Sequence, residues 1–182
     1  MVKIALKDGS KIEVEQGTTI LDVAKKISEG LARVATCGEV NGEIKDLRYE
    51  IQEDSNLVIH TFNEEDLDGK KAYWHTTSHI MAQAVQRLFP NVKFAIGPSI
   101  NEGFYYDFDV ERPFSEDDIA ALEEEMKKII KEDLTIERFE LPREEAIKLM
   151  EEREEPYKIE LINDLPDGEI ISFYKQGEFV DL

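Results

Sequence analysis

Two of the three histidines of this chain, His75 and His79, stand four residues apart in the run "YWHTTSHIMAQAV". If this run is helical, both side chains lie on one face, with Cβ atoms about 5–6 Å apart. The pair could then act on one metal ion, one water molecule or one substrate atom. It could equally be part of ordinary packing, and the spacing alone leaves these interpretations open.

A zinc protease is excluded, because Thr76 stands where the H-E-x-x-H motif needs its general-base glutamate. A third zinc ligand is not evident, and we expect His60 and the single cysteine, Cys37, to be structural residues. The sequence contains no Gly-x-Ser-x-Gly nucleophile segment and no glycine-rich phosphate loop. The histidine pair is left as a candidate for proton transfer or for positioning a water molecule.

The chain is acidic, with a net charge of −19 over 182 residues. Residues 1–62 account for −3 of this charge and residues 63–182 for −16, which predicts two units joined near residue 63. General nucleic-acid binding needs a basic face, because neutralised phosphates supply most of the affinity. Any contact with nucleic acid must therefore be local, or be helped by another domain.

The sequence predicts a cytoplasmic protein. One cysteine excludes an internal disulfide and is typical of a reducing compartment. No segment approaches the roughly 18 apolar residues of a membrane span. The first residues, "MVKIALKDGS", lack the apolar core and cleavage site of a signal peptide. We therefore expect no membrane partner.

The first unit has the pattern of a small α+β domain. Residues 2–15 alternate around an Asp-Gly pair, which is typical of a hairpin. Residues 17–30 predict one amphipathic helix that ends at Gly30. An Asn-Gly turn and a strand at 56–62 follow. This order indicates a sheet that grasps a single helix, as in ubiquitin.

The second unit predicts helices packed on a sheet. A helix from about Lys70 to Pro90 carries the histidine pair, and the aromatic run "GFYYDFDV" follows as a strand. Pro113 and Ser115 precede a strongly amphipathic helix. The remaining segments are predicted as a strand "LTIERFEL", a helix "REEAIKLMEERE", and the strands "YKIELI", "IISFYK" and "EFVDL".

Four segments together resemble the N-terminal part of bacterial threonyl-tRNA synthetases. They are "HTTSHIMAQAVQRLFP", "AIGPSINEGFYYDFD", "YKIELI" and "GEFVDL". The resemblance covers essentially the whole chain, and the pairing of H-x-x-x-H with the Gly-Phe-Tyr-Tyr-Asp strand is distinctive. It implies that residues 1–62 are a TGS domain with the ubiquitin-like β-grasp fold. It also implies that residues 63–182 are a mixed α/β editing domain, shared in outline with alanyl-tRNA synthetases.

The resemblance implies hydrolysis of serine misattached to tRNA(Thr). His75 and His79 would line the site, with His75 assisting the water or the ribose hydroxyl. Lys158 would stabilise developing negative charge, and Asp181 would hold the substrate's ammonium group or orient a water. Tyr106 would shape the pocket. From the residues alone, Lys158 could be a surface strand residue, Asp181 a chain-end charge and Tyr106 a core residue.

The family carries a Cys-x-x-x-His motif that completes the editing site, and these residues end at Leu182, where that cysteine is expected next. We therefore expect a truncated editing domain without tightly bound zinc, in which part of the catalytic site is missing. The resemblance places ATP, Mg and Zn in an aminoacylation core outside these residues, together with the contacts of a homodimer. tRNA(Thr) is the implied partner. The alternatives are a non-catalytic TGS-containing module that binds tRNA or protein, and a free-standing trans-editing hydrolase.

Overall fold

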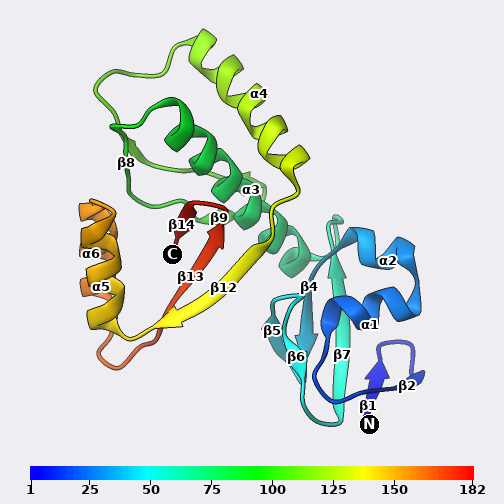
Figure 1. Ribbon diagram of the computed structural model, residues 1–182. Helices are drawn as coiled ribbons and strands as arrows, with labels where there is room; N and C mark the ends of the chain where they lie inside the picture. The colour runs from blue at the N-terminus through cyan, green and yellow to red at the C-terminus, as the bar shows by residue number, and fades with distance from the viewer. The chain divides into compact units, whose positions relative to one another are not determined.

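The computed structural model describes residues 1–182, and its internal contacts divide the chain into two compact units (Figure 1). The first unit consists of Met1–His75 with Ser99–Gly103, and the second of Thr76–Pro98 with Phe104–Leu182. Each unit has its own buried hydrophobic clusters. None of the helices combines the length and the hydropathy that crossing a membrane requires.

The first unit is a mixed sheet that carries one main helix. Its five strands have the order β2-β1-β7-β4-β5, with β1 and β7 parallel and the other neighbours antiparallel. Buried apolar side chains of the sheet enclose Ile20 and Val23 of the helix α1. A small ladder pairs β3 with β6. The elements are β1 (Val2–Leu6), β2 (Lys11–Val14), β3 (Thr18–Thr19), α1 (Ile20–Ile27), α2 (Glu29–Val34), β4 (Ala35–Val40), β5 (Glu43–Lys45), β6 (Glu50–Ile51) and β7 (Ser55–Thr61).

Most local signals of the first unit are confirmed. The Asp-Gly pair joins β1 to β2 as an antiparallel hairpin, and Gly9 takes a φ of 84° there. The Asn-Gly pair joins β4 to β5. The prediction that one helix ends at Gly30 is wrong. The first helix ends at Ile27, and the hydroxyl of Ser28 accepts a hydrogen bond from Leu31 N–H and so caps a second helix, α2.

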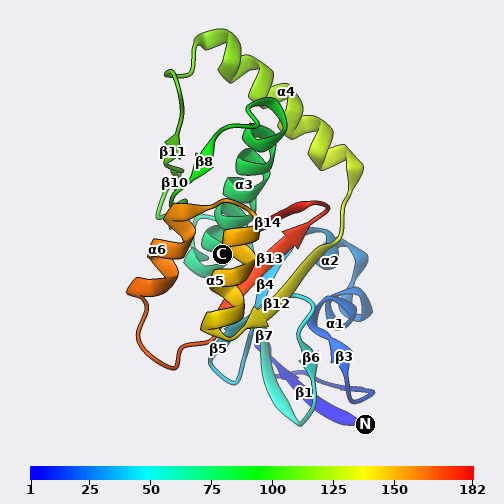
Figure 2. The same ribbon diagram turned by 60° about the vertical axis from the view of Figure 1, so that its left-hand side comes forward.

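The second unit packs helices on both faces of a three-stranded antiparallel sheet with the order β12-β13-β14. Helices α5 and α6 cover one face, and the part of α3 within this unit covers the other (Figures 1 and 2). The helix α4 lies along α3, where Arg87 pairs with Glu125 and Glu132. The elements are α3 (Leu67–Leu88), β8 (Lys93–Phe94), β11 (Phe108–Asp109), α4 (Glu116–Glu132), β12 (Ile136–Leu141), α5 (Arg143–Glu152), α6 (Pro156–Asp164), β13 (Ile171–Gln176) and β14 (Phe179–Asp181).

Two strand predictions in this unit are wrong. "YKIELI" is not a strand but part of helix α6, which Pro156 opens at its first position. Its buried residues, Lys158 and Ile162, stand one helical turn apart and Glu160 between them is exposed, so the burial follows a period of 3.6 and not of 2. The aromatic run "GFYYDFDV" is not one strand either. It forms the short strands β10 (Gly103–Phe104) and β11, separated by an irregular segment that contains Tyr106.

Candidate functional site

A buried ion pair between Lys158 and Asp181 forms the centre of the candidate site. The Lys158 ammonium, from the first turn of α6, lies 2.5 Å from Asp181 Oδ1 on the last strand, β14. Lys158 is 4% exposed and Asp181 is 2% exposed. Burying two charges costs several kcal/mol per ion and is tolerated only where each charge is paired. The pair is therefore a constrained feature and not a surface salt bridge.

Tyr106 closes a triangle with these two residues. Its hydroxyl donates to Asp181 Oδ2 at 2.5 Å and accepts from Lys158 Nζ at 3.0 Å. The Tyr106 ring is held by close contact with the backbone of Gly97, because a Cβ at that position would lie 2.1 Å from a ring carbon. Position 97 therefore requires a glycine, because any side chain there would displace the Tyr106 ring and with it the hydroxyl.

His79 approaches the same carboxylate from helix α3. Its Nε2 lies 3.6 Å from Asp181 Oδ2, and its ring packs against the edges of Tyr174 and Phe179. The neighbouring Ser78 hydroxyl donates to the carbonyl of Gly97. The helix and the segment that supports Tyr106 are therefore joined beside the cluster.

The electrostatics of the cluster favour an ionised aspartate. Burial by itself would raise the pKa of Asp181. The charges of Lys158 and His79, with hydrogen bonds from Lys158 and Tyr106, outweigh burial and hold the pKa below its usual value. Burial and the adjacent Asp181 charge raise the pKa of Tyr106 far above its usual value. The phenol is therefore a stable hydrogen-bond donor at neutral pH.

The structure thus brings together four of the five residues singled out from the sequence: His79, Tyr106, Lys158 and Asp181. They come from four separate segments of the second unit. His75 is half-buried and stands one helical turn before His79 on α3. It is the last residue of this segment that belongs to the first unit, and the second unit begins at Thr76. The contacts of the cluster given above do not involve it.

Other residues around the cluster carried no clear sequence signal. Glu155 and Arg153 line a small cavity of about 10 Å³ together with Lys158 and Asp181. This volume is close to the minimum that one water molecule needs. Glutamate and arginine are usually solvent-exposed, so nothing in the sequence marked these two. Gly97 is an exception, because it lies in the run "AIGPSINEGFYYDFD", which is one of the segments that carry the family resemblance.

The cluster does not have the donors of a metal site. No group of three or more His, Cys, Asp or Glu side chains is arranged so that it could hold a metal ion. The oxygens of Asp181 accept from Lys158, Tyr106 and the Leu182 N–H. A lysine ammonium in contact with the only carboxylate beside His79 opposes a second cation there.

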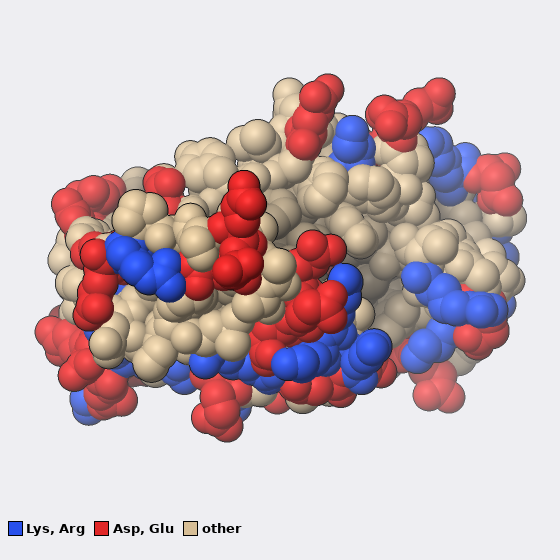
Figure 3. Space-filling model, turned by 90° about the horizontal axis from the view of Figure 1, so that it is seen from above, with Lys and Arg blue, Asp and Glu red and all other residues tan.

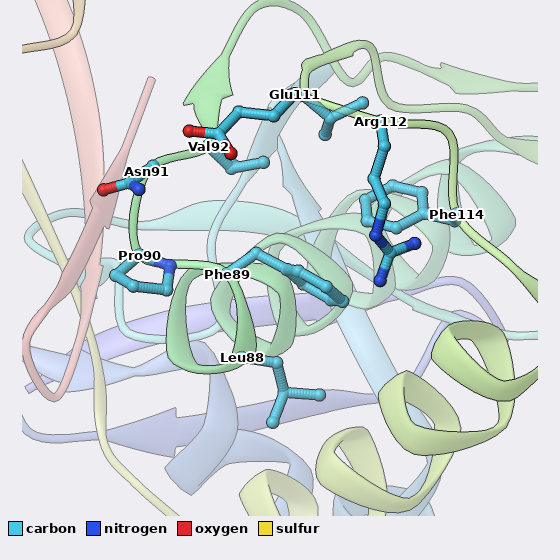
Figure 4. A pocket seen from close by; sticks show the side chains of 9 residues that line it. Leu88, Phe89, Pro90, Asn91, Val92, Glu111, Arg112 and Phe114 are labelled. Carbon is cyan, nitrogen blue, oxygen red and sulfur yellow. The ribbon is translucent and has the colours of Figure 1, made fainter.

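A larger pocket of this unit lies elsewhere, at the C-terminal end of α3. It has a volume of about 180 Å³ and a mainly apolar lining, with Phe89 and Phe114 among its side chains (Figure 4). Arg112, at its rim, is held by both carboxylate oxygens of Asp118. None of the residues predicted for the site lines this pocket.

The surface charge is consistent with the acidic composition. On the face drawn in Figure 3, basic side chains are interrupted by acidic ones. Several basic side chains of the chain form ion pairs with nearby acidic ones, such as Lys127 with Glu123 and Glu124.

Comparison with known proteins gives matches along the whole chain. Residues 2–61 match the TGS domain family. All 182 residues are 66% identical to part of the threonine–tRNA ligase of Acetivibrio thermocellus, and 61% identical to part of that of Clostridium perfringens. Over 179 residues the chain is 62% identical to part of that of Caldanaerobacter subterraneus, which covers 98% of the chain. In each case the chain spans 28% of the length of the relative.

Proposed function

From the similarity of the whole chain to the N-terminal region of threonine–tRNA ligases, we propose that this chain is a section of such an enzyme and supplies its hydrolytic proofreading site. The parent enzyme would attach threonine to tRNA(Thr) with ATP. Residues 63–182 would form the editing domain, which removes serine that has been attached in error. Residues 1–62 would form the TGS domain.

The need for such a site follows from the two amino acids. Serine lacks one methyl group of threonine, and a missing methylene changes binding by only about 1–3 kcal/mol. A pocket built for threonine cannot exclude the smaller serine by its shape. A second site that hydrolyses the serine ester and rejects the extra methyl group restores fidelity.

Ester hydrolysis needs an activated water, a stabilised oxyanion and a proton for the leaving hydroxyl. In the proposed roles, the Lys158 ammonium supplies positive charge for developing negative charge, and Tyr106, whose one hydroxyl proton is donated to Asp181, shapes the pocket. Asp181 holds both groups in place, since its two carboxylate oxygens already accept from them. His79 and His75 line the site, and His75 assists the water or the ribose hydroxyl.

One observation carries the proposal: side chains from four segments of the chain converge in a single buried cluster of hydrogen bonds and ion pairs. A buried lysine–aspartate pair is costly to maintain. Buried and electrostatically perturbed groups of this kind are typical of functional sites. The cluster lies within the residues whose motifs resemble the editing domain.

The partners and cofactors of the parent enzyme are part of the same proposal. tRNA(Thr) would be the macromolecular substrate. ATP, Mg and Zn would bind in an aminoacylation core outside these residues, which would also carry the contacts of a homodimer. We place the protein in the cytoplasm, and we propose that the chain itself works without a metal.

The experiment is a timed deacylation of seryl-tRNA(Thr) and threonyl-tRNA(Thr). It would use this chain and a chimera in which residues 1–182 replace the matching section of the Acetivibrio thermocellus ligase. We expect the chimera to hydrolyse the serine ester and spare the threonine ester. Lys158→Met should lower kcat by about 100-fold or more, as does the loss of one oxyanion donor elsewhere.

Two further variants test the assignment of roles. His75→Ala should also lower kcat on the serine ester. Lys148→Met, which alters an exposed lysine of α5, should leave it unchanged. A native chimera that does not hydrolyse the serine ester would refute the editing proposal and favour a non-catalytic binding module. Hydrolysis by the isolated chain would favour a free-standing hydrolase.

A further inference from the structure

The start of helix α6 decides where the Lys158 ammonium lies, because Lys158 is the third residue of that helix. Glu155 precedes the helix, and its side chain does not cap it. Instead, Glu155 Oε2 accepts a hydrogen bond of 3.1 Å from the backbone N–H of Phe94 in β8. Glu155 N–H donates to the carbonyl of Met150. The residue is thus fixed by its side chain and by its backbone.

Phe94 is a suitable anchor because it lies among the other residues of the site. It is buried, and its ring packs edge-on against Tyr106 and Phe179. Tyr106 donates to Asp181, and Phe179 stands two residues before Asp181 on β14. The Glu155–Phe94 hydrogen bond therefore ties the helix of Lys158 to the segments that carry its two partners.

The packing around this connection leaves little room for adjustment. The cavity that Glu155 shares with Lys158 and Asp181 has a volume of about 10 Å³. This volume is too small for a further side chain. A shorter side chain at Glu155 would reach the Phe94 N–H only if the start of α6 moved.

Two substitutions at position 155 separate the effect of side-chain charge from that of side-chain length. Burial raises the pKa of the Glu155 carboxyl, and the Asp181 charge adds to this. The Phe94 N–H and the charges of Lys93 and Lys158 act in the opposite direction. Glutamine keeps the side-chain length and an acceptor oxygen but carries no charge. Aspartate keeps the charge but is one methylene shorter.

We propose that Glu155 is a positioning residue of the editing site, which holds the Lys158 ammonium on Asp181 and Tyr106 by anchoring the start of α6 to the Phe94 N–H. The role in editing rests on the proposed function, whereas the anchoring of Lys158 does not. The length of the side chain matters more for this role than its charge.

The test compares Glu155→Asp, Glu155→Gln and the control Glu160→Asp, which shortens an exposed glutamate of the same helix. In this chain, acetylation of lysines by acetic anhydride is followed by mass spectrometry, with the exposed Lys148 as the internal reference. We expect Glu155→Asp to raise the relative rate at Lys158 about tenfold. The other two variants should stay within twofold of the native chain.

In the chimera, Glu155→Asp should lower kcat on seryl-tRNA(Thr) by about 10- to 100-fold with little change in KM, because a misplaced group loses rate and not binding. Glu155→Gln should retain most of the activity. The proposal is overturned if Glu155→Asp leaves Lys158 protected, or if Glu155→Gln exposes it as much as Glu155→Asp. If Lys158 responds as expected but the native chimera is inert, the anchor is supported and the editing function fails.

Discussion

Replacing Lys158 by methionine should leave the buried Asp181 carboxylate without its closest cation. Asp181 is 2% exposed, and Lys158 is the closest cation to it. Methionine is similar in length to lysine and fills most of the same volume, so the packing changes little. The effect of the substitution therefore reports mainly on charge.

The expected loss is about 3–5 kcal/mol of the free energy of unfolding at pH 7, the usual result of breaking one half of a buried ion pair. For a chain of this size, 1 kcal/mol corresponds to about 2–4 °C in Tm. Lys158→Met should therefore lower Tm by roughly 6–20 °C. The exposed control Lys148→Met should remain within about 0.5 kcal/mol of the native chain.

The loss should also depend on pH, in a direction set by the pKa of Asp181. In the native chain this pKa lies below its usual value, so the stabilisation is present at neutral pH and is lost as the pH falls through the lowered pKa. Lys158→Met removes the charge that lowers the pKa of Asp181 most, so this pKa is higher in the variant than in the native chain. The difference between the two proteins should therefore be largest near pH 7 and shrink toward about pH 3.

The assay is urea unfolding, followed by circular dichroism, of the native chain, Lys158→Met, Asp181→Asn and the double variant. Asp181→Asn leaves the ammonium buried without its carboxylate, so it should also destabilise. The double variant should be more stable than the sum of the two single losses predicts, by about 2–3 kcal/mol. Losses below about 1 kcal/mol, or a loss that does not change between pH 7 and pH 3, would refute the buried-pair reasoning.

Three further predictions follow from close contacts and burial. Gly97→Ala should lower deacylation by the chimera, because its Cβ would lie 2.1 Å from the Tyr106 ring and would displace the hydroxyl; unchanged kinetics would contradict this. Gly69→Ala should cost roughly 1–3 kcal/mol in urea unfolding, since its Cβ would lie 2.1 Å from the carbonyl oxygen of Thr61. Cys37, whose pKa burial raises to about 11, should react with Ellman's reagent at pH 8 at least ~100-fold more slowly than in the urea-unfolded chain.

The sequence by itself determined the features that depend on a few adjacent residues. The Asp-Gly hairpin of the first unit was readable because that turn needs a residue with positive φ, which Gly9 supplies. The helix α4 was readable because Ser115 and Asp118 form a capping box. The α+β class and the β-grasp order followed from such signals, and the motifs supplied the family resemblance. His79, Tyr106, Lys158 and Asp181 were singled out in that way.

Only the tertiary structure decided how those residues meet. "YKIELI" alternates well enough for a strand, but its apolar face is buried against α5 and β13, and packing favours the helical period. Lys158 and Asp181 would ordinarily be solvated, and nothing local marks either as buried. Their pairing joins residues 23 positions apart, and its third member, Tyr106, lies 75 positions from Asp181. A buried charge is stable only beside its partner, and the fold of the whole unit sets where that partner lies.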